Sequence, residues 1–181
     1  MDEFSTYEYV VKKKNKGIGR LKPVLYIIGY VLFAVSLFFI AIKTTIAAPL
    51  FALSGFFVAL LVFLTWKYTK TEYEYSITSG HVTFSVINGN SQRRTVVSFP
   101  IKSCSTVAPI ASDEHRARAE AYRAEKTYSA LSELGATDGY FALFEDEKGK
   151  RCIFLFEATE KALKIFRFYN APATVITKVS K

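Results

Sequence analysis

Two cysteines and two histidines are the residues of this sequence whose side chains most readily do chemistry. The thiols are Cys104 and Cys152, the imidazoles are His81 and His115, and no Cys-x-x-Cys pair is present. A structural zinc site would need all four to converge without the close ligand spacing that such sites use. A Cys–His nucleophile pair stays open, although neither cysteine lies in an activated-thiol motif. We therefore interpret both cysteines as buried or half-buried thiols and expect no metal site and no cofactor.

Motifs of other catalytic classes are also missing from the sequence. It contains no nucleophile elbow, no phosphate-binding loop and no paired acid motif, and its hydroxyls and carboxylates are scattered. We therefore predict that the chain has no catalytic residues and is not an enzyme.

Basic side chains gather at two places that favour binding. Lys12, Lys13 and Lys14 form a run near the N-terminus, and Arg93 and Arg94 open a predicted strand. Adjacent strand residues point to opposite faces, so both arginines are outward only at an edge strand or before the strand begins. We predict these five residues as contacts for anionic head groups or a protein partner. A solvated strand end, and a plain topology signal for the lysine run, stay open as alternatives.

The distribution of the net charge of +8 along the chain argues against nucleic acid as a partner. A nucleic-acid-binding domain usually concentrates its basic residues in a dense stripe, whereas this charge is spread along the chain. We attribute most of it to membrane topology and to attraction toward a membrane surface.

Two apolar runs stand between these basic groups. Val24 to Ile42 and Ile46 to Trp66 contain no Asp, Glu, Lys, Arg or His. A helix needs about 17–25 residues to cross a bilayer, so each run is long enough. Hydroxyls such as Ser36, Ser54 and Thr65 can bond back to the helix backbone. We interpret the runs as a helical hairpin anchor, because the alternative of a channel or transporter unit would need a polar path through the membrane.

Basic residues around the two runs predict their orientation. Six lie before the first run, Lys67 and Lys70 follow the second, and only Lys43 lies in the loop. By the positive-inside rule both termini are cytoplasmic, in a two-span protein of the cell membrane. Cleavage of the first run as a signal peptide is the alternative, but the run is longer than a typical signal core and a second run follows at once.

The sequence after residue 70 changes to the period of strands. Residues 72–78 and 81–87 alternate polar with apolar side chains around a turn signal at Ser79-Gly80. With segments 93–99 and 101–107 they predict a four-strand antiparallel meander. Residues 140–145 and 151–157, apolar on both faces, predict the best-buried strands.

Two helices complete the prediction. Residues 112–134 are rich in alanine and charge and indicate an exposed helical insertion, with an interaction arm as its functional interpretation. The last helix begins after Thr159 as its cap, with Lys161, Lys164 and Arg167 outside, and its apolar face consists of Ala162, Ile165, Phe166 and Tyr169. The tail 174–179 either adds an edge strand or trails.

Three segments carry a resemblance to a known family: residues 72–80 (EYEYSITSG), the pair Arg93-Arg94, and residues 153–158 (IFLFEA). In this order of elements they resemble bacterial pleckstrin-homology-like (PH-like) domains, whose C-terminal helix closes an open barrel or bent sheet. With the apolar hairpin, the chain resembles small uncharacterised two-span membrane proteins of clostridia and related Firmicutes. The resemblance implies a PH-like cytoplasmic domain, but it offers no established activity to carry over, and fold does not imply function. The insertion over residues 112–134 departs from the pattern.

The sequence thus predicts an α+β chain with a basic cytoplasmic tail over residues 1–22, two transmembrane helices over 23–68, and an antiparallel PH-like β-domain over 71–181 with its insertion and closing C-terminal helix. The functional hypothesis is a non-enzymatic, membrane-anchored module that presents this domain for binding to a protein or to anionic head groups. The alternative is an accessory subunit of a membrane protein complex, recruited through its transmembrane helices, where Gly55 and Ala59 would let a partner helix approach.

Overall fold

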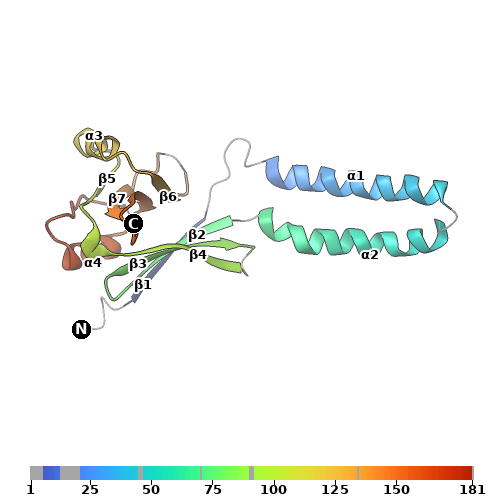
Figure 1. Cartoon of the computed structure of the whole chain (residues 1–181), viewed down its shortest axis with the longest axis horizontal. Helices are drawn as coiled ribbons and strands as arrows, with labels where there is room; N and C mark the ends of the chain where they lie inside the picture. Colours follow the sequence, from blue (N-terminus) through green and yellow to red (C-terminus); the bar gives the residue numbers. More distant parts are fainter. Residues whose placement is uncertain are drawn as a thin grey trace. The chain divides into compact units, whose positions relative to one another are not determined.

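The computed structural model describes residues 6–12, 21–44, 47–69, 71–89, 92–133 and 135–180. They divide into two units (Figure 1). The first contains the helices α1 (Lys22–Lys43) and α2 (Ala47–Thr65) and the short 3-10 helix η3 (Trp66–Thr69). The second, which we call the β-domain, contains the strands with two further α-helices.

Helices α1 and α2 pack side by side, and each is long and apolar enough to cross a membrane. The Ser36 hydroxyl donates to the Phe33 carbonyl at 2.7 Å, and the Thr65 hydroxyl donates to the Leu61 carbonyl at 2.6 Å. These bonds confirm the expectation that hydroxyls within the spans bond back to the backbone. A 2.7 Å hydrogen bond between the hydroxyls of Tyr30 and Thr65 joins the two helices.

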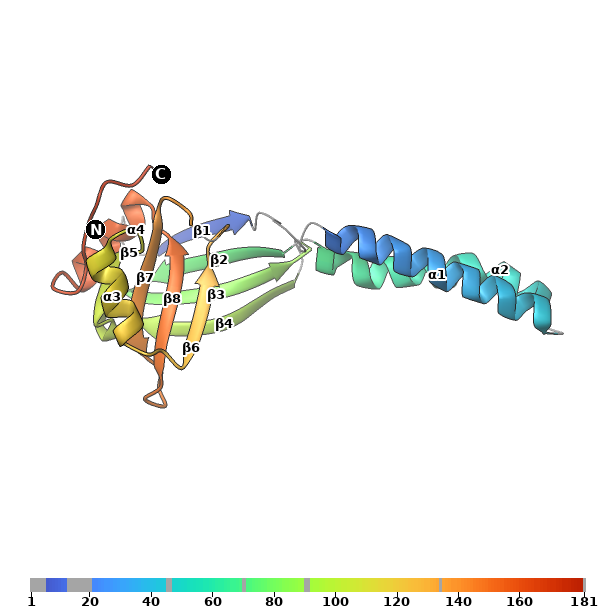
Figure 2. The same cartoon turned by 90° about the horizontal axis from the view of Figure 1, so that it is seen from above.

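The β-domain contains two four-stranded sheets, whose strands cross at a steep angle in Figure 2. Sheet A has the order β1 (Thr6–Lys12), β2 (Thr71–Thr78), β3 (His81–Asn88) and β4 (Gln92–Pro100). Sheet B has the order β5 (Thr106–Pro109), β7 (Gly139–Glu145), β8 (Arg151–Glu157) and β6 (Lys126–Ala130). In sheet B, β7 is antiparallel to β5 and β8, whereas β6 is parallel to β8. The remaining elements are η4 (Ile101–Ser103), α3 (Asp113–Ala121) and α4 (Glu160–Tyr169).

Strand β1 lies in the segment predicted as a basic tail, and this corrects the prediction for residues 1–22. It pairs with β2 in an antiparallel register that runs from Thr6 opposite Thr78 to Lys12 opposite Glu72. Its inward side chains, Tyr7, Tyr9 and Val11, alternate with exposed ones. The sequence of residues 6–12 therefore has the alternation of a strand, but the adjacent lysine run led to the prediction of a basic tail. In the sequence, α1 and α2 therefore lie between two strands that pair with each other in one sheet.

The turn between β2 and β3 agrees with the prediction from Ser79-Gly80. Both residues have positive φ, 49° and 80°, as a two-residue type I′ hairpin turn requires. A Cβ atom on Gly80 would lie 2.8 Å from Cδ1 of Tyr169 in α4. The glycine therefore serves both the turn and the close approach of α4.

Residues 101–107, predicted as the fourth strand of the meander, do not belong to sheet A. Helix η4 redirects the chain after Pro100, and the Ile101 amide donates to the Gly80 carbonyl at 2.8 Å. Strand β5 then begins at Thr106 and pairs with β7 in sheet B. The fourth strand of sheet A is β1 instead, because its aromatic face covers the edge of β2.

The helix predicted over residues 112–134 is likewise shorter in the structure. Helix α3 ends at Ala121, and Arg123 adopts a left-handed φ of 48° that a continuing helix does not allow. Residues 126–130 form β6, which covers the edge of β8 and turns Tyr128 and Ala130 toward the core. The edge of β8 is a tertiary feature, so the local sequence could not reveal it.

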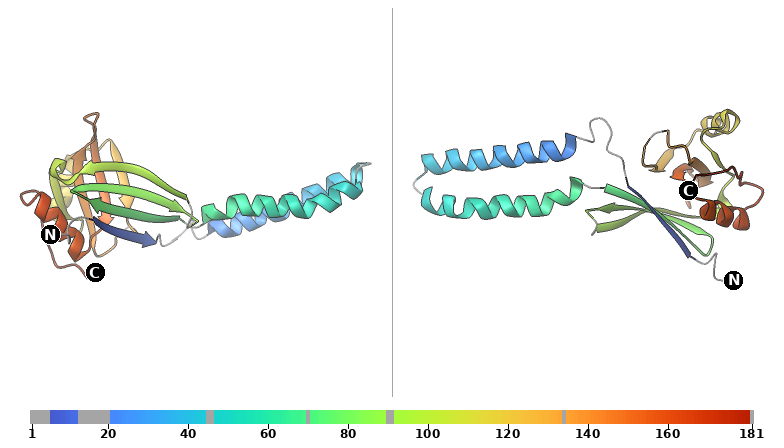
Figure 3. Two further views of the ribbon diagram at one scale, coloured as in Figure 1. Left: turned by 90° about the horizontal axis from the view of Figure 1, so that it is seen from below. Right: turned by 180° about the vertical axis from the view of Figure 1, so that it is seen from behind.

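The main core lies between the two sheets and is closed by α4 (Figure 3). Phe166 of α4 is fully buried, with its ring 5.3 Å from that of Phe156. The Ala162 amide donates to the Thr159 hydroxyl at 3.2 Å, which confirms the predicted cap. Strand β7 is buried at every position but its last, and its outer face, with Phe141, is covered partly by α3. The prediction that β7 and β8 are the best-buried strands is confirmed for β7 most clearly.

Candidate functional site

The start of β4, where the predicted arginine pair lies, precedes an irregularity of the strand that we interpret as a β-bulge. The hydroxyls of Thr83 and Ser98 are 3.1 Å apart, and those of Ser85 and Thr95 are 3.5 Å apart. Two positions along β3 thus match three along β4, so β4 contains one extra residue between Thr95 and Ser98. Arg93 lies two positions before Thr95 and shares its face, the outer face of sheet A.

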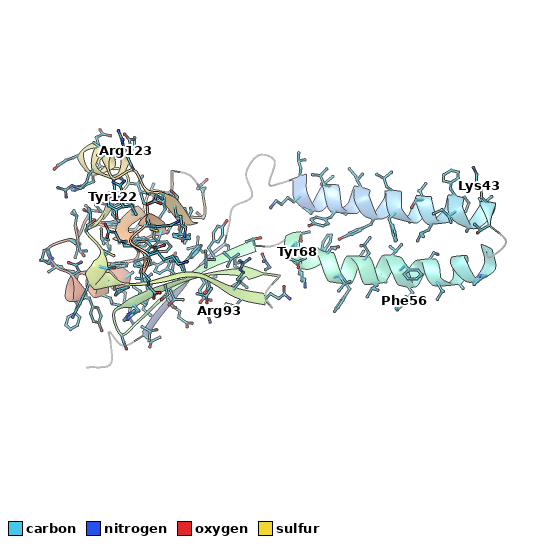
Figure 4. The ribbon with its side chains drawn as sticks, viewed as in Figure 1. Lys43, Phe56, Tyr68, Arg93, Tyr122 and Arg123 are labelled. Carbon is cyan, nitrogen blue, oxygen red and sulfur yellow. The ribbon has the colours of Figure 1, made fainter. Side chains whose placement is uncertain are left out.

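Arg93 spans this face to reach two carboxylates. Arg93 is labelled in Figure 4. Its Nη2 donates to Oε1 of Glu74 on β2 and lies 3.8 Å from Oε1 of Glu8 on β1. The two-residue turn sets Ser85 opposite Glu74, and this small residue lets the long side chain cross β3. The Glu74 side chain is only 8% exposed, against 51% for Arg93. Arg93 therefore neutralises a buried carboxylate, whereas its neighbour Arg94 is exposed on edge strand β4.

The predicted lysine run lies partly within the described residues. Lys12 is exposed at the last position of β1, opposite Glu72, and Lys13 and Lys14 lie outside the described residues. Because the strands of sheet A are antiparallel neighbours, the end of β1 and the start of β4 occur at the same end of the sheet. Lys12 and Arg94 thus share the end from which the chain leaves for the two helices.

The thiols and imidazoles do not come together. Cys104 and Cys152 lie in the main core, whereas His81 is exposed at the start of β3 and His115 is half-buried on α3. Burial raises the pKa of Cys104 from 9.0 to about 12 and also raises the pKa of Cys152. Within the described residues, no group of three or more His, Cys, Asp or Glu side chains is placed to hold a metal ion.

A groove that the sequence interpretation missed lies between α4 and the C-terminal tail. It encloses about 900 Å³, with Leu163 and Val179 among its apolar lining residues. Phe168 and Ile176, which are 66% and 41% exposed, also line it. Charged residues complete the lining: Glu160, Lys164, Arg167 and Lys178. The available signal was Phe168, an aromatic residue among the outward basic positions of the last helix.

The tail that forms one wall of this groove is fastened to the β-domain. The Val175 amide donates to the Val107 carbonyl at 2.8 Å, and Thr174 makes a parallel bridge to Val107 of β5. The Thr177 amide donates to the Tyr140 hydroxyl at 3.0 Å. Farther along, Ser180 bonds to the Asp138 carboxylate through its amide at 2.9 Å and through its hydroxyl. The tail therefore begins as an addition to the edge of sheet B, one of the two predicted outcomes.

A second groove, of about 460 Å³, lies on the hairpin of α1 and α2. Gly29 and Phe33 line it together with the joined hydroxyls of Tyr30 and Thr65. A Cβ atom on Gly29 would meet nothing within 4 Å, so this position leaves open space beside the helix.

Comparisons with known proteins agree with the fold. No curated protein and no solved structure matches the chain. The family described as Bacterial PH-like domain (DUF6106), a domain of unknown function, matches residues 1–176 and so includes β1, both apolar helices and the β-domain. The predicted resemblance to PH-like domains is confirmed, and the clostridial origin stays a prediction. The chain therefore belongs to this family of bacterial PH-like domain proteins.

Proposed function

We propose that the chain is a non-enzymatic module of the cell membrane, anchored by α1 and α2, whose PH-like domain binds a protein partner or anionic lipid head groups on the cytoplasmic side. One observation carries the membrane topology of this proposal: the seven-residue pairing of β1 with β2. Strand β1 precedes α1 and α2 in the sequence, and the rest of the β-domain follows them. Because β1 pairs with β2, β1 and the rest of the domain must be on the same side of a membrane, which needs an even number of spans. Loss of α1 as a signal peptide would also remove β1 from the sheet.

The cytoplasmic side follows from the charge distribution. Lys12, Lys67 and the other basic residues lie before α1 or after α2 in the sequence, against Lys43 alone at the end of α1 beside the connecting loop. The buried thiols support a non-catalytic role, because a Cys104 pKa of about 12 keeps this thiol protonated at neutral pH, and the thiolate is the nucleophile.

Head-group binding is assigned to the end of sheet A that leads to the helices. Arg94 and Lys12 are exposed there and are our proposed contacts, joined by Lys13 and Lys14 from the lysine run. Arg93 has a different role in this proposal, since its charge is already balanced by Glu74 and Glu8. A cation near an anionic surface contributes about 1 kcal/mol, which corresponds to about a fivefold change in affinity.

The test uses the β-domain with residues 15–70 replaced by a short Gly/Ser linker, which keeps β1 beside β2. We expect it to co-sediment with phosphatidylserine vesicles but not with neutral phosphatidylcholine vesicles. Arg94→Gln should weaken binding about fivefold, more at low salt, whereas Arg93→Gln is the matched control that lowers stability instead. If the unchanged domain co-sediments with neither kind of vesicle, the proposal of head-group binding is wrong and binding of a protein partner is the surviving proposal.

The groove on the hairpin favours the second candidate function, an accessory subunit of a membrane protein complex. Open space at Gly29 would let a helix of a partner protein pack closely. Gly29→Leu should then abolish co-purification of that partner in mild detergent. Recovery of the chain without any stoichiometric partner would count against this candidate.

A further inference from the structure

We propose that the groove between α4 and the C-terminal tail, defined by Leu163, Arg167, Phe168, Ile176 and Lys178, binds an acidic amphipathic segment of a partner protein. The site is separate from the Lys12 and Arg94 end, so it does not depend on head-group binding.

The apolar lining makes this surface unusual within the β-domain. Among the described residues of the domain, four large hydrophobic side chains are exposed, namely Val10, Val96, Phe168 and Ile176. Two of the four, Phe168 and Ile176, line this one groove, and Phe168 is the most exposed of these four. An exposed aromatic side chain beside an apolar hollow is the usual anchor of a protein interface.

The charges around the apolar lining select the partner. Glu160 and Lys164 neutralise each other through a 2.7 Å ion pair, and this bond to Lys164 lowers the pKa of Glu160. Arg167 and Lys178 then leave the groove with a positive balance. A segment with apolar side chains on one face and Asp or Glu beside them complements this surface, because rim charges of opposite sign direct encounter and reject other partners.

The groove is formed before any partner arrives. The hydrogen bonds of Val175, Thr177 and Ser180 hold the tail, and Asn170 fixes the end of α4 by donating to the carbonyls of Ile101 and Cys104 at 3.0 and 2.8 Å. Binding therefore does not have to order these walls, which lowers its entropic cost.

Two other occupants are outcomes of the test below. A second copy that used the same groove would bring Arg167 and Lys178 against the same cations, which costs free energy. A bilayer is the other, and binding to anionic vesicles distinguishes it from a peptide.

The test is a selection of displayed peptides of about 12 residues, long enough for about three helical turns. The bait is the full chain in neutral-lipid nanodiscs, and the same chain with Phe168→Ser serves for counter-selection. We expect enriched peptides to combine Asp or Glu with Leu or Phe. For one such peptide, fluorescence anisotropy should give a Kd raised at least tenfold by Phe168→Ser, since aromatic anchors dominate interfaces. The double change Arg167→Gln and Lys178→Gln should raise it about fivefold, more at low salt.

Matched controls are Val96→Ser and Lys102→Gln, which remove an exposed apolar residue and an exposed cation elsewhere on the domain. They should change the Kd less than twofold, and all the variants should unfold at nearly the same temperature, because every changed side chain is exposed. Failure to enrich acidic peptides, or equal binding to the Phe168→Ser chain, overturns the proposal. Self-association or binding to anionic vesicles that Phe168→Ser abolishes would overturn it too, in favour of a second copy or a bilayer.

Discussion

Replacing Arg93 with Gln is expected to destabilise the β-domain, because the change leaves the Glu74 carboxylate without its cation. The Glu74 side chain is 8% exposed and that of Arg93 is 51% exposed. Breaking a buried ion pair costs about 3–5 kcal/mol, and an exposed pair contributes about 0–1 kcal/mol. With one partner buried and the other half in water, we expect a loss between these limits, about 1–3 kcal/mol.

The assay is pulse proteolysis of the full chain in detergent micelles over a urea series, which reports the fraction of β-domain unfolded. Arg94→Gln is the matched control, because Arg94 has the same chemistry at an exposed position and should change stability by less than about 0.5 kcal/mol. The double change Glu74→Gln with Arg93→Gln should recover part of the loss, since the carboxylate that Arg93 neutralised is then also removed. Equal shifts of the urea midpoint for Arg93→Gln and Arg94→Gln would refute the reasoning.

Three further predictions concern packing, pH and topology. Phe166→Ala should cost about 3–5 kcal/mol in the same assay, because the ring is fully buried against Phe156, and an unmoved midpoint would make α4 peripheral. Burial raises the pKa of Cys104 to about 12 and that of Tyr75 well above 10.0, so the folded state favours their protonated forms. Their contribution to the free energy of unfolding should therefore be fully present well below pH 9.0, the ordinary thiol pKa, and be lost as the pH rises toward the pKa values of the folded state. Cys104→Ala should show a smaller loss over the same pH range. A urea midpoint that is constant up to about pH 11 would contradict this. In intact cells an impermeant maleimide should label a cysteine at Thr44 but not one at Lys102, with the buried native thiols silent; the reverse pattern would invert the topology.

Short-range patterns in the sequence were sufficient for elements whose cause is local. The apolar runs give α1 and α2 because the length and lack of charge that make a span are properties of one segment. Likewise Thr159 caps α4, and Ser79-Gly80 forms its turn, through atoms a few residues apart. The match to the PH-like family agrees with this order of elements.

The secondary-structure predictions that needed correction were those for segments whose structure depends on a neighbouring strand. Residues 6–12 form a strand that pairs with the edge of β2, and residues 126–130 form a strand that pairs with the edge of β8. The local sequence of either segment does not indicate which strand it will pair with. Arg93 and Arg94 have different roles in the structure for the same reason. Only the register of three strands brings Glu74 within reach of one arginine and leaves the other exposed.

The sequence by itself therefore determined the two membrane-length helices, the amphipathic closing helix and the presence of a β-domain, since each rests on the periodicity of one continuous segment. Only the tertiary structure decided that the hairpin is inserted between paired strands, that Arg93 supports a buried carboxylate, and that Phe168 borders a basic groove. These features join residues that lie tens of positions apart in the chain, and their proximity follows from how the sheets, α4 and the tail pack together.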